Sequence, residues 1–404
     1  MSDLDVLAAR ADAHLMHTYP PAPAAFLRGQ GTVLFDADGA PWLDFLCGLA
    51  VTNLGHAHPA VTAAVARQAG TLVHTSNLFL TEPAVQLAQR LGELTGWDDA
   101  RVFFAQCGAT ANEAAIKLAR KHGKAQHPDK VRVVALEGSF HGRTMATLEA
   151  TGQPAKHVPF APLAGFVDHV PFDDAEALRT AVTDETCAVL VEVVQGEGGV
   201  RPVPDDVLRA ARDACDAHGA LLIVDEVQTG IGRTGPWFAY QASPIVPDVI
   251  TLAKALANGL PIGACIAHGA AAAVFEPGDH ATTFGGNPVT CAAALAVLDT
   301  IVADNLLVTA AARATRLRDG LARLADASPL VVGVRGAGLL LGVELAQPVA
   351  AAVAAACRDR HLIVNAVAAD VVRLAPPLTV SRQEIDQAVD VLGAAVAVTA
   401  AGTT

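Results

Sequence analysis

Short apolar runs alternate with longer amphipathic stretches through the middle of this chain. Six of the runs are nearly continuous in β-branched and other apolar residues, which is typical of strands buried on both faces. They lie at 101–106, 131–136, 188–194, 220–225, 248–253 and 263–269. The intervening stretches have helical periodicity, and Gly123 and Gly219 predict where two of the helices end. The pattern predicts an α/β fold with a large, mostly parallel sheet covered by helices.

The pattern changes after about residue 287. A long helical region over 288–326 is followed by two strands, a helix, two more strands and a final helix, at 331–336, 339–345, 348–360, 361–367, 371–376 and beyond residue 381. Ser381 and Glu384 predict a capping box for that last helix. A hairpin is expected over 31–45. We therefore predict an N-terminal segment over 1–60, a large domain over 61–286 and a smaller α/β domain over 287–404.

Composition narrows the classes of partner. The 404 residues are 52% hydrophobic, enough to bury a large core, and the formal net charge of −13 argues against nucleic acid or an anionic membrane surface. The N-terminus lacks a long apolar run, and the alanine-rich stretches are too short to span a bilayer. The seven cysteines show no metal-ligand spacing, which predicts reduced, mostly buried thiols and no metal site. We expect a soluble cytoplasmic protein.

Polar residues follow three of the predicted strands. Asp225 ends one buried strand, Lys254 follows the next, and a small-residue stretch at 108–110 joins a strand to a helix. Ligands of open parallel sheets bind beyond the carboxyl ends of the strands. A buried amine, a carboxylate and a helix N-terminus that can hold a phosphate are the groups that pyridoxal phosphate requires.

Each of these features has a simpler interpretation when it is taken alone. A lysine at a strand end is usually a surface residue, and an aspartate there often caps a turn. A single junction between strand, glycine and helix is weak evidence for a phosphate site. Their occurrence together on neighbouring strand ends favours pyridoxal phosphate.

Several longer motifs then give the chain a resemblance to a known family. The motifs are LDFLCGLAVTNLGHAHPAV, HTSNLFLTEP, GSFHGRT, VEVVQGEGG, LLIVDEVQTGIGRTG, TLAKALANGLPIGA, TTFGGNP and VVRLAPPL. Together they resemble the class III aminotransferases, which are fold-type-I enzymes dependent on pyridoxal phosphate. Within that class the chain is most similar to the acetylornithine aminotransferases.

The resemblance implies a role for each of a set of cofactor-binding residues. Lys254 would form the Schiff base, Asp225 would pair with the pyridine nitrogen, and Phe140 would stack on the ring. Gln228 would bind the phenolic oxygen, with Glu226 and Val227 on the same turn. The cofactor phosphate would be held by Gly108, Ala109 and Thr283, the last from the partner subunit of a homodimer.

The resemblance also implies which residues bind the substrates. Arg143 would bind the carboxylate of an acylated ornithine, and Arg373 the α-carboxylate of glutamate or 2-oxoglutarate. Planar guanidinium groups suit such carboxylates, although for either arginine taken alone a surface or structural ion pair is the commoner role. Glu197 would mask Arg373 while the amino donor is bound, and Thr282 would lie beside the substrate. The implied reaction is a reversible ping-pong transamination in arginine biosynthesis.

Departures from the family pattern, and alternative interpretations, bear on these expectations. Ala109 stands where the family usually has a threonine that binds the phosphate, and Thr110 is the next hydroxyl along the chain. Leu49 occupies a place where ornithine aminotransferases have an aromatic residue, which favours an acylated substrate, although core packing explains a leucine as well. Tyr19 either lines the substrate entrance or packs on the surface. Other ω-amines (succinylornithine, succinyl-diaminopimelate, ornithine or 4-aminobutyrate) remain alternative substrates, and a non-catalytic binding protein is the alternative of another class.

Overall fold

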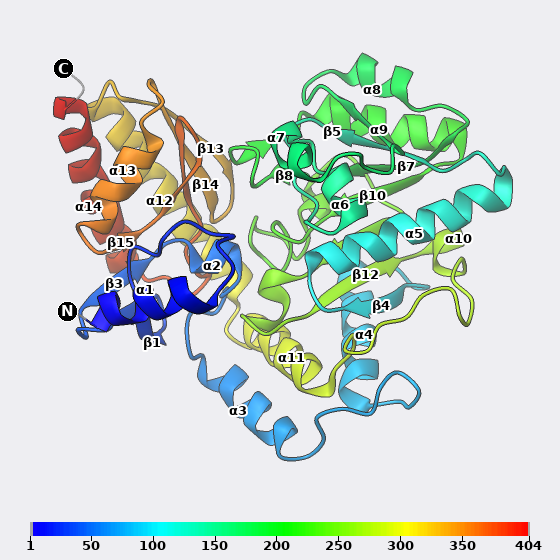
Figure 1. Cartoon of the computed structure of the whole chain (residues 1–404), viewed down its shortest axis with the longest axis horizontal. Helices are drawn as coiled ribbons and strands as arrows, with labels where there is room; N and C mark the ends of the chain where they lie inside the picture. The colour runs from blue at the N-terminus through cyan, green and yellow to red at the C-terminus, as the bar shows by residue number, and fades with distance from the viewer. Residues whose placement is uncertain (1–2, 403–404) are drawn as a thin grey trace.

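The computed structural model describes residues 3–402. A seven-stranded sheet forms the centre of the larger part, with strand order β4-β12-β11-β10-β7-β5-β6 (Figure 1). Its strands are β4 (Arg101–Ala105), β5 (Arg132–Leu136), β6 (Val167–Val170), β7 (Thr186–Val191), β10 (Leu221–Asp225), β11 (Val249–Leu252) and β12 (Gly263–Ala267). The prediction of a large, mostly parallel sheet is therefore confirmed. β12 departs from it, because it runs antiparallel to both of its neighbours.

Helices cover both faces of this sheet, as the continuous apolar strands predict. Alternate residues of β10 belong to different clusters: Leu222 and Val224 pack in the cluster that includes α9, while Leu221 and Ile223 pack in the one that includes α5. Side chains alternate along a strand, so a strand covered on both faces must be apolar at every position. The helices and short strands around the sheet are α5 (Gly108–Gln126), α6 (Met145–Ala150), α7 (Pro154–His157), η1 (Val158–Phe160), α8 (Ala175–Ala181), β8 (Val194–Gln195), β9 (Arg201–Pro202), α9 (Asp205–His218), η2 (Ala239–Ala242), η3 (Lys254–Ala257) and α10 (Gly269–Ala272).

Of the two helix ends predicted from glycines, one is confirmed and one is wrong. α9 ends at His218, and Gly219 adopts φ 62° in the left-handed region, as predicted. The predicted end of α5 at Gly123 is wrong, because the helix continues to Gln126. A Cβ at Gly123 would lie 2.3 Å from the carbonyl oxygen of Lys130, so this glycine permits close packing inside the helix.

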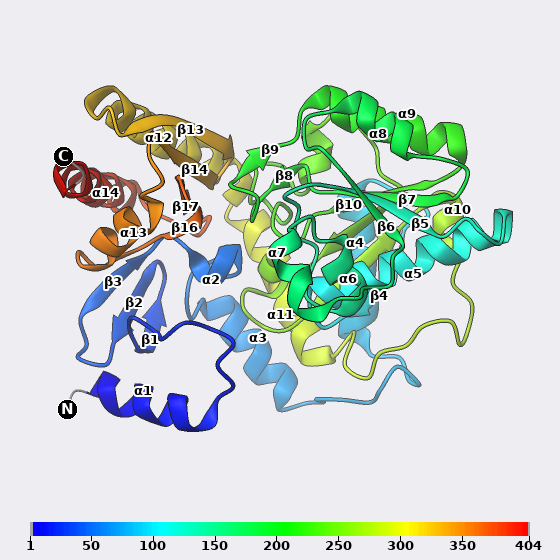
Figure 2. The same cartoon turned by 45° about the horizontal axis from the view of Figure 1, so that its top comes forward.

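The N- and C-terminal segments lie together on the other side of the molecule (Figures 1 and 2). Two four-stranded sheets occur there, β1-β2-β3-β15 and β13-β14-β17-β16. The N-terminal elements on this side are α1 (Asp3–His14), β1 (Phe26–Gln30), β2 (Val33–Asp36), β3 (Pro41–Asp44) and α2 (Cys47–Ala50). After them, α3 (Pro59–Ala69) and α4 (Glu82–Thr95) lead toward the large sheet, where α4 packs against β4. The C-terminal elements are α11 (Pro288–Ala303), α12 (Leu306–Ala327), β13 (Val331–Ala337), β14 (Leu340–Leu345), α13 (Ala350–Arg358), β15 (Leu362–Ile363), β16 (Asn365–Ala368), β17 (Val371–Leu374) and α14 (Arg382–Gly402).

Two C-terminal predictions need correction. The helical region 288–326 is two helices, because Asn305 takes φ 49° and breaks the chain direction between them. The strand expected over 361–367 is divided between two sheets: β15 pairs with β3 and β16 pairs with β17. The first of these pairings joins the N-terminal strands to the C-terminal segment. The predicted domain boundaries themselves stay a prediction.

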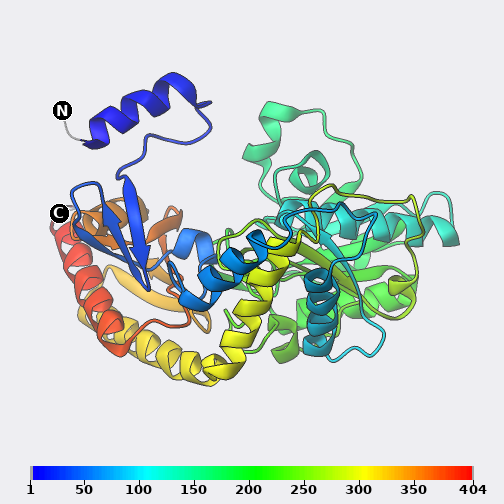
Figure 3. The ribbon, with the colours of Figure 1, turned by 90° about the horizontal axis from the view of Figure 1, so that it is seen from below.

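The predicted hairpin and the final capping box are both present. β2 and β3 pair antiparallel, with Val33 opposite Leu43. The Ser381 hydroxyl oxygen accepts the Glu384 N–H at 3.1 Å, and the Glu384 carboxylate accepts the Ser381 N–H at 2.6 Å. α14 is long and apolar enough, by composition, to cross a membrane. In this fold it packs against α12 and α13 (Figure 3) with five apolar residues buried, Ile385, Ala388, Leu392, Ala395 and Val396.

Candidate active site

Residues from successive strand ends line one cavity of about 420 Å³. β4, β5, β7, β10 and β11 all end at this edge of the large sheet, and their following residues face the same space. Nine of the predicted site residues line it: Gly108, Ala109, Phe140, Arg143, Glu197, Asp225, Val227, Gln228 and Lys254. The fold therefore brings together residues that are 146 positions apart in the chain.

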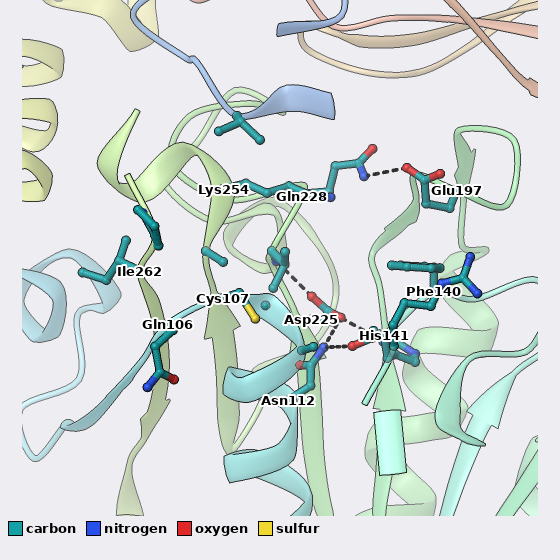
Figure 4. A pocket seen from close by; sticks show the side chains of 18 of the residues that line it. Gln106, Cys107, Asn112, Phe140, His141, Glu197, Asp225, Gln228, Lys254 and Ile262 are labelled. Carbon is teal, nitrogen blue, oxygen red and sulfur yellow. Dashed lines mark hydrogen bonds and ion pairs between the residues drawn. The ribbon is translucent and has the colours of Figure 1, made fainter. Parts of the chain in front are cut away.

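Asp225 lies at the base of the cavity, where three hydrogen bonds hold its carboxylate (Figure 4). Its Oδ2 accepts hydrogen bonds from Asn112 Nδ2 at 2.7 Å and bonds His141 Nδ1 at 2.8 Å. Its Oδ1 accepts the Val227 N–H at 3.0 Å. The Thr251 hydroxyl fixes the Asn112 amide in turn, at 2.6 Å. These partners stabilise a buried negative charge and hold it in one orientation.

Lys254 follows β11 and begins η3 at the same edge of the sheet. Its backbone has φ 44°, a left-handed conformation that costs free energy for a residue with a side chain. Burial lowers the pKa of the Lys254 amine, and the carboxylates of Glu197, Asp225 and Glu192 only partly oppose that effect. A lowered pKa leaves a larger fraction of the lysine uncharged, and the uncharged amine is the nucleophile.

The N-terminus of α5 presents its first backbone N–H groups to the cavity through Gly108 and Ala109. Such groups lack acceptors within the helix and favour an anion. The Thr110 hydroxyl accepts the N–H groups of Gln106 and Cys107, at 3.2 and 3.1 Å, and donates to the Cys107 carbonyl. Thr110 therefore caps the helix and does not replace the hydroxyl missing at Ala109.

Arg373 reaches the site from β17 but does not line the cavity, because other side chains cover it. Its Nη1 donates to Glu197 Oε1 at 2.5 Å, to Gln228 Oε1 at 3.0 Å and to the Gly196 carbonyl at 3.1 Å. Burial raises the pKa of Glu197, but the charge and hydrogen bond of Arg373 outweigh it, so the net shift is downward. The other amino group of the guanidinium, Nη2, is buried without a hydrogen-bond partner.

Phe140 and Arg143 form the opposite wall, in the loop after β5. The guanidinium carbon of Arg143 lies 5.6 Å from the centre of the Phe140 ring. Arg143 is exposed, in contrast to the fully covered Arg373. The two arginines therefore come from different elements, and they differ in exposure: Arg143 is open to solvent, whereas Arg373 is buried and ion-paired.

Thr282 and Thr283 lie apart from the cavity that contains Lys254. Thr283 lines a second pocket with residues of the 74–88 segment. The Thr282 hydroxyl is hydrogen-bonded to Gln106, which does line the main cavity. Tyr19 is 87% exposed and Leu49 is 40% exposed, and neither lines the cavity. The partner-subunit role of Thr283 stays a prediction.

Glu226 also lies outside the cavity, although its neighbours on the same turn face it. Its carboxylate accepts the Tyr240 N–H at 2.8 Å and bonds the Thr229 hydroxyl. Several residues for which the sequence implies no role also line the cavity: Val51, Gln106, Asn112, Glu192, Leu260 and Ile262. The strand predicted over 188–194 runs through Glu192, whereas β7 ends at Val191, so only the structure places Glu192 at a strand end as Asp225 is.

Comparison with known proteins agrees with this geometry. Residues 15–396 match the model of the family described as aminotransferase class III. The acetylornithine aminotransferase of Mycolicibacterium smegmatis is 50% identical over 96% of this chain and 97% of its own length. That of Streptomyces coelicolor is 51% identical over 94% of this chain and 92% of its own length.

Solved structures show the same fold. The ornithine aminotransferase of Toxoplasma gondii has a TM-score of 0.94 at 30% identity, covering 100% of this chain and 97% of its own. The N-acetylornithine aminotransferase of Stenotrophomonas maltophilia has a TM-score of 0.85 at 34% identity, covering 98% and 99%. The chain therefore belongs to the class III aminotransferases, enzymes that transfer an amino group with pyridoxal phosphate.

Proposed function

We propose that the chain is an N-acetylornithine:2-oxoglutarate aminotransferase acting in arginine biosynthesis. Its reversible ping-pong reaction converts N-acetylornithine and 2-oxoglutarate into N-acetylglutamate 5-semialdehyde and glutamate. The names of the relatives at about 50% identity support the substrate. The observation that carries the proposal is a single cavity that holds Lys254, Asp225 and Arg143, with Arg373 masked behind Glu197.

The residues present fit pyridoxal phosphate. The N-terminus of α5 can hold the phosphate, and Asp225 is fixed to accept a hydrogen bond from a protonated pyridine nitrogen. A Cβ at Gly108 would lie 2.7 Å from the Val227 side chain, so this position requires a residue without one. Phe140 and Val227 are the side chains proposed to enclose the ring, with Gln228 at its phenolic oxygen.

Bound pyridoxal phosphate supplies an aldehyde that condenses with amines and a ring that delocalises electrons released at the substrate carbon. Lys254 would hold the cofactor and, once displaced, carry the proton at the reacting carbon. Asp225 would keep the ring nitrogen protonated, because its negative charge is buried and fixed. The lowered pKa of Lys254 fits this task, since an uncharged amine can accept that proton.

The two arginines would separate the two substrates. Arg143, exposed at the wall of the cavity, would bind the α-carboxylate of N-acetylornithine in a planar, charge-assisted contact. For glutamate, the Glu197 carboxylate would leave Arg373, and the substrate carboxylate would take its place. The unpartnered Nη2 of Arg373 offers a second donor for that carboxylate. One site could then accept both a neutral acylamino end and a dicarboxylate.

We propose further that the enzyme is a cytoplasmic homodimer in which Thr283 and Thr282 serve the partner's site. Large apolar side chains are exposed around the pocket that Thr283 lines, including Leu78, Phe79, Leu80 and Phe284, which are 85%, 70%, 90% and 60% exposed. An apolar surface of this kind is typical of an interface. Sedimentation or light scattering of the purified protein would measure the assembly.

The substrate is tested by comparing kcat/KM for acetylornithine, succinylornithine, succinyl-diaminopimelate, ornithine and 4-aminobutyrate, each with 2-oxoglutarate. We expect acetylornithine to have the highest value. A higher value for ornithine would contradict both the proposed substrate and the interpretation of Leu49. A purified protein that shows no cofactor absorbance in the visible and stays inactive after cofactor is added would instead indicate a binding protein.

Lys254→Ala is expected to lower turnover about 10³-fold, whereas Lys124→Ala, on the exposed end of α5, should leave it unchanged.

A further inference from the structure

Glu192 is a buried carboxylate in the cavity to which the proposed mechanism gives no task. It stands directly after β7, between two loops that carry predicted site residues. Its Oε1 accepts the Phe140 N–H at 2.9 Å, and its Oε2 accepts the Gly196 N–H at 3.1 Å. One carboxylate therefore fixes the loop that carries the ring-stacking residue and the loop that carries Glu197.

Gly196 is held on three sides. Its N–H donates to Glu192, its carbonyl accepts from Arg373 at 3.1 Å, and a Cβ on it would lie 2.1 Å from Gln228 Oε1. Glu197 is the next residue, so the position of the Gly196 backbone sets where its carboxylate lies. Losing the Glu192 acceptor would remove one of the two backbone hydrogen bonds that hold Gly196.

We propose that Glu192 is a positioning residue that holds the Gly196–Glu197 segment where Glu197 masks Arg373, and so sets the balance between the two substrates. This inference rests on the proposed function. When Glu192 holds the segment, the Glu197–Arg373 pair is stable and the site favours the ω-amine donor. When the segment is loose, Arg373 is uncovered more of the time, and binding of the acylated amine weakens relative to glutamate.

The charges around Glu192 make this balance sensitive to pH. His141, Asp225 and Lys254 act on it electrostatically from the loop after β5, the end of β10 and η3. Burial raises the pKa of Glu192 to about 7; Asp225 adds to the rise, whereas His141 and the two N–H groups oppose it. Protonation converts one accepting oxygen into a donor, so one of the two loops loses its acceptor below that pH.

The first test needs no variant. The KM for acetylornithine and the KM for glutamate are measured in separate half-reactions, by the change in cofactor absorbance, from pH 6 to 8.5. We expect the ratio of the acetylornithine KM to the glutamate KM to rise as the pH falls through about 7. A ratio that does not change across this range would contradict the inference.

The second test replaces the carboxylate. Glu192→Gln should raise the same KM ratio about tenfold and remove its pH dependence. Glu149→Gln is the matched control, because Glu149 is also buried and accepts three backbone N–H groups, from Ala164, Phe166 and Val167, outside the cavity. The control should lower the melting temperature and leave the ratio unchanged.

The outcomes separate the two proposals. Wild-type protein that transaminates neither substrate contradicts the proposed function itself. Active wild-type protein with a Glu192→Gln variant whose two KM values rise equally contradicts only the positioning role. Visible circular dichroism of the bound cofactor reports whether the variant retains the cofactor, and the wild-type pH series decides the question if the variant does not fold.

Discussion

The base and the mouth of the cavity are built differently. At the base, Asp225 has three hydrogen-bond partners and is 3% exposed. At the mouth, Arg143 is exposed, and the Thr282–Thr283 segment lies beyond the cavity wall. A group that must keep one charge and one orientation is preorganised by burial, whereas groups that bind and release substrates remain accessible. Changes at the base should therefore affect chemistry and stability together, and changes at the mouth only binding.

The largest effect is expected from Asp225→Asn. The amide keeps the shape but removes the charge, and its NH₂ group is a donor, so only one of the two accepting oxygens remains. Turnover should fall about 10²- to 10³-fold, with a lower melting temperature. The matched control is Asp248→Asn, because Asp248 accepts the Leu222 N–H and pairs with Arg212 at the opposite end of β11. The control should lower the melting temperature and leave turnover unchanged. Unchanged turnover in Asp225→Asn would contradict the role proposed for Asp225 at the cofactor's ring nitrogen.

Arg143→Ala tests whether the side chain at the mouth of the cavity acts in substrate binding alone. Because the side chain is exposed and makes no ion pair to another residue in the described structure, we expect an unchanged melting temperature. The KM for acetylornithine should rise roughly tenfold to a hundredfold, the range for a lost charge-assisted contact. Arg143→Lys should recover part of this, since a lysine keeps the charge but not the planar fork. An equal effect of Arg323→Ala, on the exposed face of α12, would show that net charge alone is responsible.

A smaller effect concerns the stability of the protein without cofactor. The pKa of Lys254 is lower in the folded chain than its ordinary value of about 10.5. Between those two values the unfolded chain binds more protons, so the unfolding free energy should rise with pH through that window. Below that window the full cost of the lowered pKa remains in the folded chain. Lys254→Met should therefore stabilise the cofactor-free protein by about 1 kcal/mol, measured by denaturant unfolding; destabilisation would contradict the burial argument.

The smallest effect is expected at Cys107, at the start of α5. Six of the seven cysteines are buried, and Cys107 is exposed at the predicted phosphate site. One thiol of the cofactor-free native protein should therefore react rapidly with a disulfide reagent, and bound cofactor should slow that reaction. Cys107→Ser should remove the rapid phase and change the unfolding free energy by less than about 0.5 kcal/mol. Two or more rapidly reacting thiols would contradict the burial pattern.

Local patterns were sufficient for much of the fold. Buried strands of the large sheet could be predicted because continuous apolar runs have few other solutions in a soluble α/β protein. β6 was missed, because its sequence Val-Asp-His-Val carries two polar residues and lacks that signal. The antiparallel direction of β12 could not be predicted from its own residues either, because the direction of a strand depends on how the preceding loop turns.

The site shows the same division. Lys254 and Asp225 could be predicted because each places a charge at the end of an apolar strand, and the family motifs added Arg143, Arg373 and Glu197 as expectations. Glu192 was not singled out, although it stands in an equivalent position. Its importance depends on which backbone N–H groups it meets, and those belong to residues 52 and 4 positions away.

The sequence by itself determined the alternation of buried strands and helices, the residues that carry charge at strand ends, and the resemblance that indicates the reaction. These follow from periodicity and residue type, which act over a few positions. Only the tertiary structure decided that Asn112 and His141 hold Asp225, that Arg373 also bonds Gln228 and the Gly196 carbonyl, and that Glu192 joins two loops. The physical reason is that hydrogen bonds and burial are satisfied between segments far apart in the chain, and their pairing is fixed only when the sheets pack.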